Sequence, residues 1–257
     1  MIKIKRENCP PLLNKPNNEF VEGDCNNADV ENSLLEMQHD KCCYCERNIG
    51  QLERQEREVE HYVPKSAFKN GGQNVQWHQA NKWENLLFAC RPCNSRKSTK
   101  NPFNKTTGER EIIDPSQASI DPEDHIDFVL SRKTYICFKE RNGSLLGRST
   151  IEKLKLNERK KLLRDFRNRR SEIEQEFISL YTAVEIDETR EINKIRIALK
   201  RLTSADITFA SFNRQFIKQR LKMFNEDDLT ELGAWHGRPF EEIEIDVLSG
   251  YETIELS

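Results

Sequence analysis

The chain has 257 residues, 41 Lys or Arg against 43 Asp or Glu, and a formal net charge of −2. This length allows one large domain or two small ones. The balanced charge gives no global sign of nucleic-acid binding, so any such function must rest on local patches. The sequence holds no run of 18 apolar residues and no cleavable apolar signal segment. We therefore expect a cytoplasmic protein without a membrane span.

The N-terminal part of the chain predicts an irregular arm followed by one helix. Residues 1–25 begin with a short strand pattern at Ile2–Ile4 and continue through a proline-rich stretch. From Ala28 to His39 the apolar residues recur at nearly helical spacing, which predicts an amphipathic helix. This helix leads directly into the first of two cysteine pairs.

Two Cys-x-x-Cys pairs enclose a segment of 44 residues. Their members are Cys42, Cys45, Cys90 and Cys93. A two-residue gap lets adjacent thiolates bind one tetrahedral Zn²⁺, and four sulfur ligands leave no open coordination position, so we predict a structural zinc site. The alternatives are a redox dithiol or buried free thiols. Eight cysteines without a secretion signal favour a reducing compartment over disulfides.

The enclosed segment carries the candidate chemistry. Val59–Val63 predicts a short strand, in which Glu60 and His61 point to opposite faces unless a bulge relaxes it. One hypothesis is that Glu60 binds a catalytic cation while His61 takes a proton from water; the alternative for His61 is a solvated or packing histidine. Leu86–Phe88 is compatible with a strand or a buried helical turn. A short basic helix is predicted to begin at the second cysteine pair.

These residues together resemble a known family. The ordered set is Cys42-x-x-Cys45, Glu60-His61-x-x-Pro64, Trp83-x-Asn85-Leu86 and Cys90-x-x-Cys93-Asn94-x-x-Lys97. It is similar to the HNH endonuclease family, whose ββα-metal fold pairs a hairpin with one helix. The resemblance implies a metal-dependent endonuclease that hydrolyses nucleic-acid phosphodiester bonds.

The resemblance also implies residue roles. His61 would be the general base. Asn85 would brace the loop and orient His61. Glu60 and Asn94 would bind a catalytic Mg²⁺ or Mn²⁺, in keeping with the preference of these ions for oxygen ligands. Lys97 would lie near a phosphate, with Arg96 as a further nucleic-acid contact. The first acidic position is often Asp in the family, and its replacement by Glu60 could shift the cation or select another metal.

A wider pattern covers roughly residues 30 to 170 and comprises Lys41–Glu46, Val59–Lys65, Ile113-Asp114-Pro115, Asp121–Ile126 and Thr150-Ile151 to Leu156-Asn157. This pattern resembles the HNH subunits of retron-associated and Septu-type phage-defence systems. It implies a partner ATPase of the ABC or SMC-like kind and nuclease activity released during infection. The resemblance also implies a nucleic-acid substrate, with DNA favoured over RNA. The alternative function is a non-catalytic, zinc-stabilised subunit that binds nucleic acid or acts as a scaffold.

The second half of the chain has a β pattern, followed by predicted helices and then by an acidic tail. Residues 112–146 have a β pattern that begins at Ile112-Ile113, and Asn142-Gly143 predicts a hairpin turn between strands. Helices are then predicted at Thr150–Lys155, Asn157–Ala183 with Asn157 as N-cap, Glu188–Leu202 and Phe209–Phe224. The last 33 residues, 225–257, hold ten acidic residues against one arginine, a composition that suits a partner-docking tail.

A basic run over residues 153–170 contains nine Lys or Arg and two acidic residues. It predicts contacts to a nucleic-acid backbone, with Arg167, Arg169 and Arg170 preferred; the alternative is a solvated helix face. The sequence as a whole predicts an α+β protein. Its divisions are an arm at 1–25, an HNH nuclease domain at 26–110, a small β subdomain at 111–148, a helical domain at 149–224 and the acidic tail at 225–257.

Overall fold

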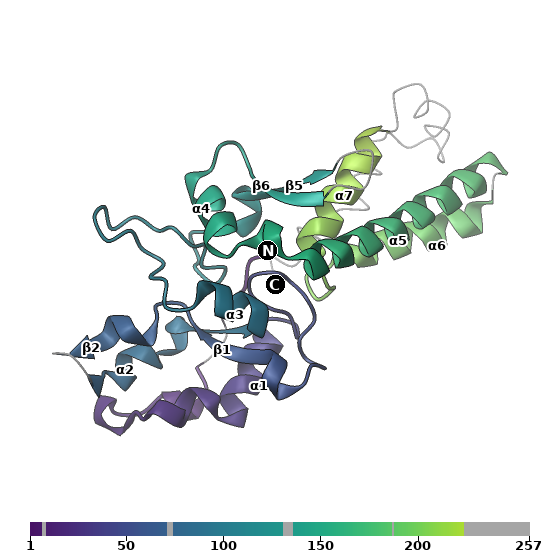
Figure 1. The fold of residues 1–257 in the computed structure, drawn as a ribbon. Coiled ribbons are helices and arrows are strands. Elements are labelled where there is room, and N and C mark those ends of the chain that lie inside the picture. The colour runs from purple at the N-terminus through teal and green to yellow at the C-terminus, as the bar shows by residue number, and fades with distance from the viewer. Residues whose placement is uncertain (7–8, 71–73, 131–135, 187, 224–257) are drawn as a thin grey trace. The chain divides into compact units, whose positions relative to one another are not determined.

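The computed structural model describes residues 1–6, 9–70, 74–130, 136–186 and 188–223 (Figure 1). The chain divides into two compact units. The first comprises residues 1–127 and 138–159, and the second comprises residues 128–137 and the described residues from 160 onward. The predicted acidic tail lies outside the described residues.

The first unit is built on a two-stranded hairpin and one helix. Strand β1 (Arg57–His61) pairs antiparallel with β4 (Leu86–Cys90), with His61 opposite Leu86 at one end of the register. Helix α3 (Arg91–Lys97) follows β4 without a linker, and Pro in its first turn suits a position where no backbone N–H partner is needed. The predicted strand around Glu60, the basic helix and the ββα order are confirmed. The segment that begins at Leu86 is a strand and not a helical turn.

All five residues of β4 are buried, and helix α1 (Ala28–Met37) packs against this strand. Asn27 begins α1 because its side-chain oxygen accepts a hydrogen bond from the Asp29 backbone N–H. Just after the helix, the buried amide of Gln38 donates to the Phe88 carbonyl and accepts from the Phe88 N–H, at 2.8 Å each. The predicted helix is confirmed, and Gln38 joins its end to the strand that carries the second cysteine pair.

The loop from β1 to β4 contains a small ribbon and a short helix. Strands β2 (Lys69–Asn70) and β3 (Asn74–Val75) pair antiparallel, and α2 (Trp77–Ala80) follows. The strand predicted at Ile2–Ile4 is wrong. Both isoleucines are buried, but the backbone is irregular because Ile4 N donates only to the Pro115 carbonyl, at 2.7 Å, and no strand among the described residues lies alongside.

A second hairpin lies in the later part of the chain. Strands β5 (Ile126–Leu130) and β6 (Ile136–Glu140) pair with each other, and helix α4 (Leu145–Lys153) follows. The predicted hairpin turn at Asn142-Gly143 is wrong. Both residues have positive φ, as such a turn requires, but Ser144 then caps α4 by accepting from Gly147 N, so the turn leads from a strand into a helix.

Two further predictions in this region need correction. Ile112 and Ile113 are fully buried but form no strand, because Ile113 N donates to the hydroxyl of Thr150 and not to a neighbouring backbone. Asn157 does not cap the long helix. Its side chain bonds both the N–H and the carbonyl of Phe138, at 2.7 and 2.9 Å, and so extends the edge of β6.

The second unit is helical. It contains α5 (Lys160–Glu185), α6 (Thr189–Leu202) and α7 (Ala210–Met223), and α5 packs against both of the others. Its core is aromatic: the rings of Phe128, Phe166 and Phe212 lie 4.9 to 5.2 Å apart by their centroids. The three predicted helices are confirmed, as is the α+β class. Among the described residues, no helix has the length and apolarity needed to cross a bilayer.

Candidate active site and metal centre

The four predicted zinc ligands converge. The Sγ atoms of Cys42, Cys45, Cys90 and Cys93 all lie within 4.8 Å of one another, and all four residues are buried. Sγ of Cys45 and Sγ of Cys90 are 3.8 Å apart. A tetrahedron with metal–sulfur bonds of about 2.3 Å has an edge of about 3.8 Å, so the cluster fits a zinc ion. Cys43 is buried outside the cluster.

An arginine that the sequence analysis did not single out contacts this cluster. Arg159 is 5% exposed, and its guanidinium donates to Sγ of Cys93 at 2.8 Å and to Sγ of Cys90 at 3.5 Å. Burial lowers the pKa of Arg159, but the thiolate charges outweigh this and raise the pKa, so the side chain stays cationic. Four thiolates around a bound Zn²⁺ would carry a net charge of −2, and Arg159 would offset part of this charge.

His61 lies at the end of β1, where burial leaves it 8% exposed. Its Nε2 is 3.0 Å from Oδ1 of Asn81, the residue that follows α2. Burial lowers the pKa of His61 to about 4; the bond to Asn81 opposes this shift, and the charges of Lys65 and Lys97 add to it. The imidazole is therefore neutral at physiological pH and able to accept a proton.

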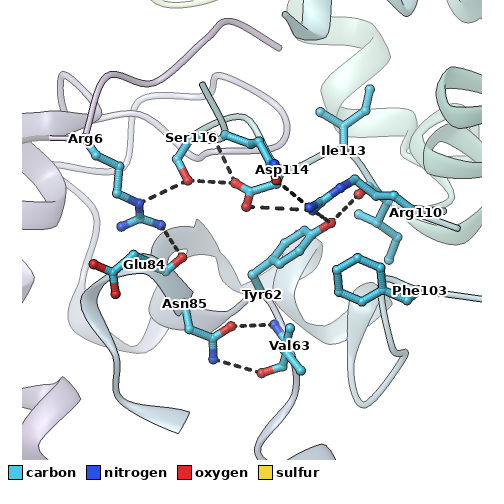
Figure 2. A network of polar contacts seen from close by, with 12 residues as sticks. Arg6, Tyr62, Val63, Glu84, Asn85, Phe103, Arg110, Ile113, Asp114 and Ser116 are labelled. Carbon is cyan, nitrogen blue, oxygen red and sulfur yellow. Dashed lines mark hydrogen bonds and ion pairs between the residues drawn. The ribbon is translucent and has the colours of Figure 1, made fainter. Parts of the chain in front are cut away.

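Asn85 braces the loop on the other side of His61. Figure 2 shows that its side chain makes two hydrogen bonds to the backbone of Val63: Oδ1 accepts from Val63 N at 2.7 Å and Nδ2 donates to Val63 O at 3.0 Å. Nδ2 also donates to the carbonyl of Ala80, at 2.9 Å. Asn85 thus fixes Val63, two residues after His61, and Ala80, directly before Asn81. The ring of His61 itself is held by Asn81.

Tyr62 anchors the same loop from the opposite face. Its hydroxyl donates to the Ile112 carbonyl at 2.6 Å and accepts from the guanidinium of Arg110, which lies over the rings of Tyr62 and Phe103 (Figure 2). These side chains, with Asn85, line a cavity of about 250 Å³. The backbone after His61 is therefore fixed on both sides.

Glu60 and Lys97 form a buried ion pair. The Nζ atom of Lys97 lies 2.6 Å from Oε1 of Glu60 and 2.7 Å from the carbonyl oxygen of His61. The side chain of Lys97 is 0% exposed and that of Glu60 is 2% exposed. The Tyr44 hydroxyl donates to the same carboxylate at 3.2 Å. Burial raises the pKa of Glu60 to about 7, although Lys97 and Tyr44 act in the opposite direction.

The two predicted cation ligands are not in contact with each other. The side-chain amide of Asn94 donates to the carboxylate of Glu58, which shares a face of β1 with Glu60. Glu58 is about two-fifths exposed, whereas Glu60 is buried beneath it. Oxygen ligands suited to Mg²⁺ or Mn²⁺ are present at this face, but the structure places Glu58 and not Glu60 beside Asn94.

The predicted nucleic-acid contacts differ in availability. Lys97 is fully buried, so it faces no surface in this structure, and Arg96 is half-buried with Nη1 on the Pro92 carbonyl at 3.3 Å. In the second unit Arg167 is exposed, whereas Arg169 and Arg170 pair with glutamates one helical turn further along α5.

Comparison with known proteins agrees with this geometry. Residues 42–100 match the family model described as HNH endonuclease. The chain contains an HNH domain. This range includes both cysteine pairs, the hairpin β1–β4 and helix α3, which are the elements that hold His61 and Asn85.

The chain also resembles two known proteins over a longer range than the HNH domain. The chain is 29% identical over 170 residues to Septu protein PtuB of Bacillus thuringiensis, an alignment that covers 63% of this chain and 57% of that protein. It is 28% identical over 236 residues to Septu protein PtuB of Bacillus mycoides, which covers 76% and 78% respectively. The chain thus spans little more than half of the first relative. No solved structure gives a significant match.

The likeness to the HNH family and to Septu proteins is confirmed, while the retron-associated part of the resemblance stays a prediction. Several residues that shape the site were missed, among them Asn81, Arg159 and Gln38. Asn81 and Gln38 follow helices, where polar residues are common, and Arg159 lies in a generally basic run. Their pattern carried no signal that separates them from ordinary surface residues.

Proposed function

We propose that this chain is a metal-dependent HNH endonuclease that hydrolyses nucleic-acid phosphodiester bonds. The observation that carries the proposal is the neutral imidazole of His61, which lies at the end of strand β1 in a ββα element. Four clustered cysteines hold the two ends of this element together. Hydrolysis needs a base to take a proton from water, and His61 is in the right protonation state for that role. The zinc has no open position and supplies only rigidity.

The catalytic cation would be held between β1 and α3, where Glu58 is partly exposed and Glu60 is buried. Asn94 is the proposed ligand on the helix and Glu60 the one on the strand, and Mg²⁺ or Mn²⁺ bound there would stabilise negative charge on the phosphate. Because Glu60 is paired with Lys97 and Asn94 bonds Glu58, Glu58→Gln has to be compared with Glu60→Gln. The variant that raises the Mg²⁺ concentration for half-maximal cleavage identifies the carboxylate ligand.

We further propose that the chain is the nuclease of a phage-defence system and works with an ATPase of the ABC or SMC-like kind. The similarity to two Septu PtuB proteins supports this. Exposed apolar side chains on the helical unit supply a surface that a partner could cover; they are Ile178, Tyr181, Ile186 and Ile197. DNA is the proposed substrate, and Arg167 is its proposed contact on the second unit.

The test is incubation of the zinc-loaded protein with labelled plasmid DNA and with total RNA. Each substrate is tried with Mg²⁺, with Mn²⁺ and without added cation, in the presence and absence of the partner ATPase. Cation-dependent cleavage of DNA is expected. A folded, zinc-loaded protein that binds nucleic acid but cleaves neither substrate under any of these conditions would instead favour the non-catalytic scaffolding subunit.

A further inference from the structure

We propose that Asn81 is a positioning residue for the base: its side-chain oxygen holds His61 with the proton on Nε2 and leaves Nδ1 as the atom that takes the proton from water. The inference rests on the proposed function of His61 and deepens it. It also gives the N-terminal arm a role, since the arm supplies the group that orients Asn81.

The amide of Asn81 has one orientation that satisfies its neighbours. Nδ2 donates to the carbonyl oxygen of Val21, at 2.8 Å, so Oδ1 is the atom that faces Nε2 of His61 at 3.0 Å. A reversed amide would place its oxygen against the Val21 carbonyl, and two acceptors cannot bond each other. Since Oδ1 only accepts, Nε2 of His61 must be the donor and carries the proton.

The other ring nitrogen is left free. Among the described residues, Nδ1 of His61 has no hydrogen-bond partner, and this atom keeps a small solvent-accessible surface. In the neutral ring with a proton on Nε2, Nδ1 holds the lone pair. The atom open to water is therefore the one that can accept a proton.

Asn81 is itself rigidly placed. It is fully buried, and its backbone N–H donates to the Trp77 carbonyl at 2.8 Å, closing α2. Asn85 bonds the carbonyl of the preceding Ala80 and also clasps Val63, two residues after His61. The two asparagines thus have separate roles, because Asn85 fixes the backbone on both sides and Asn81 fixes the ring.

The step that this arrangement serves is balanced in atoms and charge. As the water oxygen forms its bond to phosphorus, one water proton passes to Nδ1 of His61. The phosphorus–oxygen bond to the 3′ oxygen breaks, and the electron pair leaves on that oxygen. The ring becomes a cation whose Nε2–H remains bonded to Asn81, so the ring does not need to turn during the transfer.

The experiment combines a spectrum with kinetics. In zinc-loaded protein with ¹⁵N-labelled histidine and no added divalent cation, NMR should show His61 with an unprotonated Nδ1 and a protonated Nε2; His61→Gln assigns the signals. Asn81→Leu, which is similar in size but has no acceptor, should lose the single tautomer and lower kcat by about 10- to 100-fold with little change in KM. Asn81→Asp keeps an acceptor and should restore part of kcat, and the exposed Asn74→Leu serves as control.

A His61 spectrum with the proton on Nδ1 would overturn the proposal, as would Asn81→Leu with an unchanged tautomer and unchanged kcat. The wild-type spectrum decides the tautomer by itself, so the proposal stays falsifiable if Asn81→Leu does not fold. It also separates the two proposals: absence of cleavage in wild-type protein contradicts the proposed function, whereas the spectrum reports on the Asn81 contact whether or not cleavage is seen.

Discussion

The ammonium of Lys97 lies 2.6 Å from the carboxylate of Glu60, and both side chains are almost completely buried. Lys97 also donates to the carbonyl of His61, so this ion pair fastens helix α3 to the end of β1 where the candidate base lies. A charged pair in such a place stabilises the protein only while both members are present.

Replacing one member should therefore cost more than replacing both. Lys97→Met leaves a buried carboxylate without its partner and should lower the free energy of unfolding by about 3–5 kcal/mol; Glu60→Gln with Lys97→Met should recover much of this. Urea unfolding of the single and double variants measures the difference. Lys194→Met, which breaks an exposed pair with Glu191, is the control and should cost less than about 1 kcal/mol. Losses that simply add would contradict the coupling.

The His61 imidazole should titrate far below an ordinary histidine. Its pKa is lowered to about 4 by burial, below the usual value of about 6.5. The unfolded chain binds a proton at higher pH than the folded one, so the contribution of His61 to stability is complete above pH about 6.5 and is lost as pH falls toward 4. NMR titration of zinc-loaded protein without added divalent cation, with His61→Gln to assign the signal, gives the midpoint. A midpoint at 6.5 or above would contradict the buried placement of the ring.

Arg159 should govern how firmly the cysteine cluster holds zinc. Arg159→Met removes the cation that contacts Cys93 and Cys90, and this should speed zinc release to a colorimetric chelator by about 10-fold or more. Arg148→Met, at a half-exposed arginine paired with Glu140, is the matched control. Equal release rates for the two variants would show that Arg159 does not stabilise the metal site.

The exposed apolar residues of the helical unit should mediate docking of the ATPase. Ile178 and Ile197 are 52% and 69% exposed, and Ile178→Asp with Ile197→Asp should weaken partner binding by at least about 10-fold. Leu145→Asp, at a residue of the first unit that is 76% exposed, controls for a general effect of new surface charge. If calorimetry gives the same affinity for the helical-unit variant and the wild type, docking uses another surface.

Sequence reasoning located the parts of the site that depend on fixed local spacing. The four cysteines are identified by their two-residue gaps, and the strand and the basic helix by their local patterns. Asn85 was singled out by the resemblance to the HNH family. Contacts between distant segments were missed. Gln38 meets Phe88 across 50 residues, and Arg159 meets Cys93 across 66, so no local pattern marks either pair.

Local signals also failed where tertiary structure decided the outcome. Asn142-Gly143 has the backbone conformation of a hairpin turn, yet the next residue is Ser144, whose side chain begins a helix. Ile112 and Ile113 are apolar, β-branched and buried, but neither pairs with a strand. Ile113 N donates to the Thr150 hydroxyl, and Ile112 N donates to the carbonyl of Pro102 in a loop. The apolar composition of this segment correctly predicted that it is buried. It did not show whether a neighbouring strand is present to pair with it.

The proposed function depends on His61 as the base that takes a proton from water. Single-turnover cleavage of labelled DNA by His61→Ala, compared with His78→Ala, tests this role. His78 lies in α2, and among the described residues its side chain makes no hydrogen bond or ion pair. We expect His61→Ala to lose at least about 100-fold in cleavage rate while it keeps the zinc content of His78→Ala and still unfolds in one cooperative transition. Cation-dependent cleavage by His61→Ala at the wild-type rate would contradict the claim.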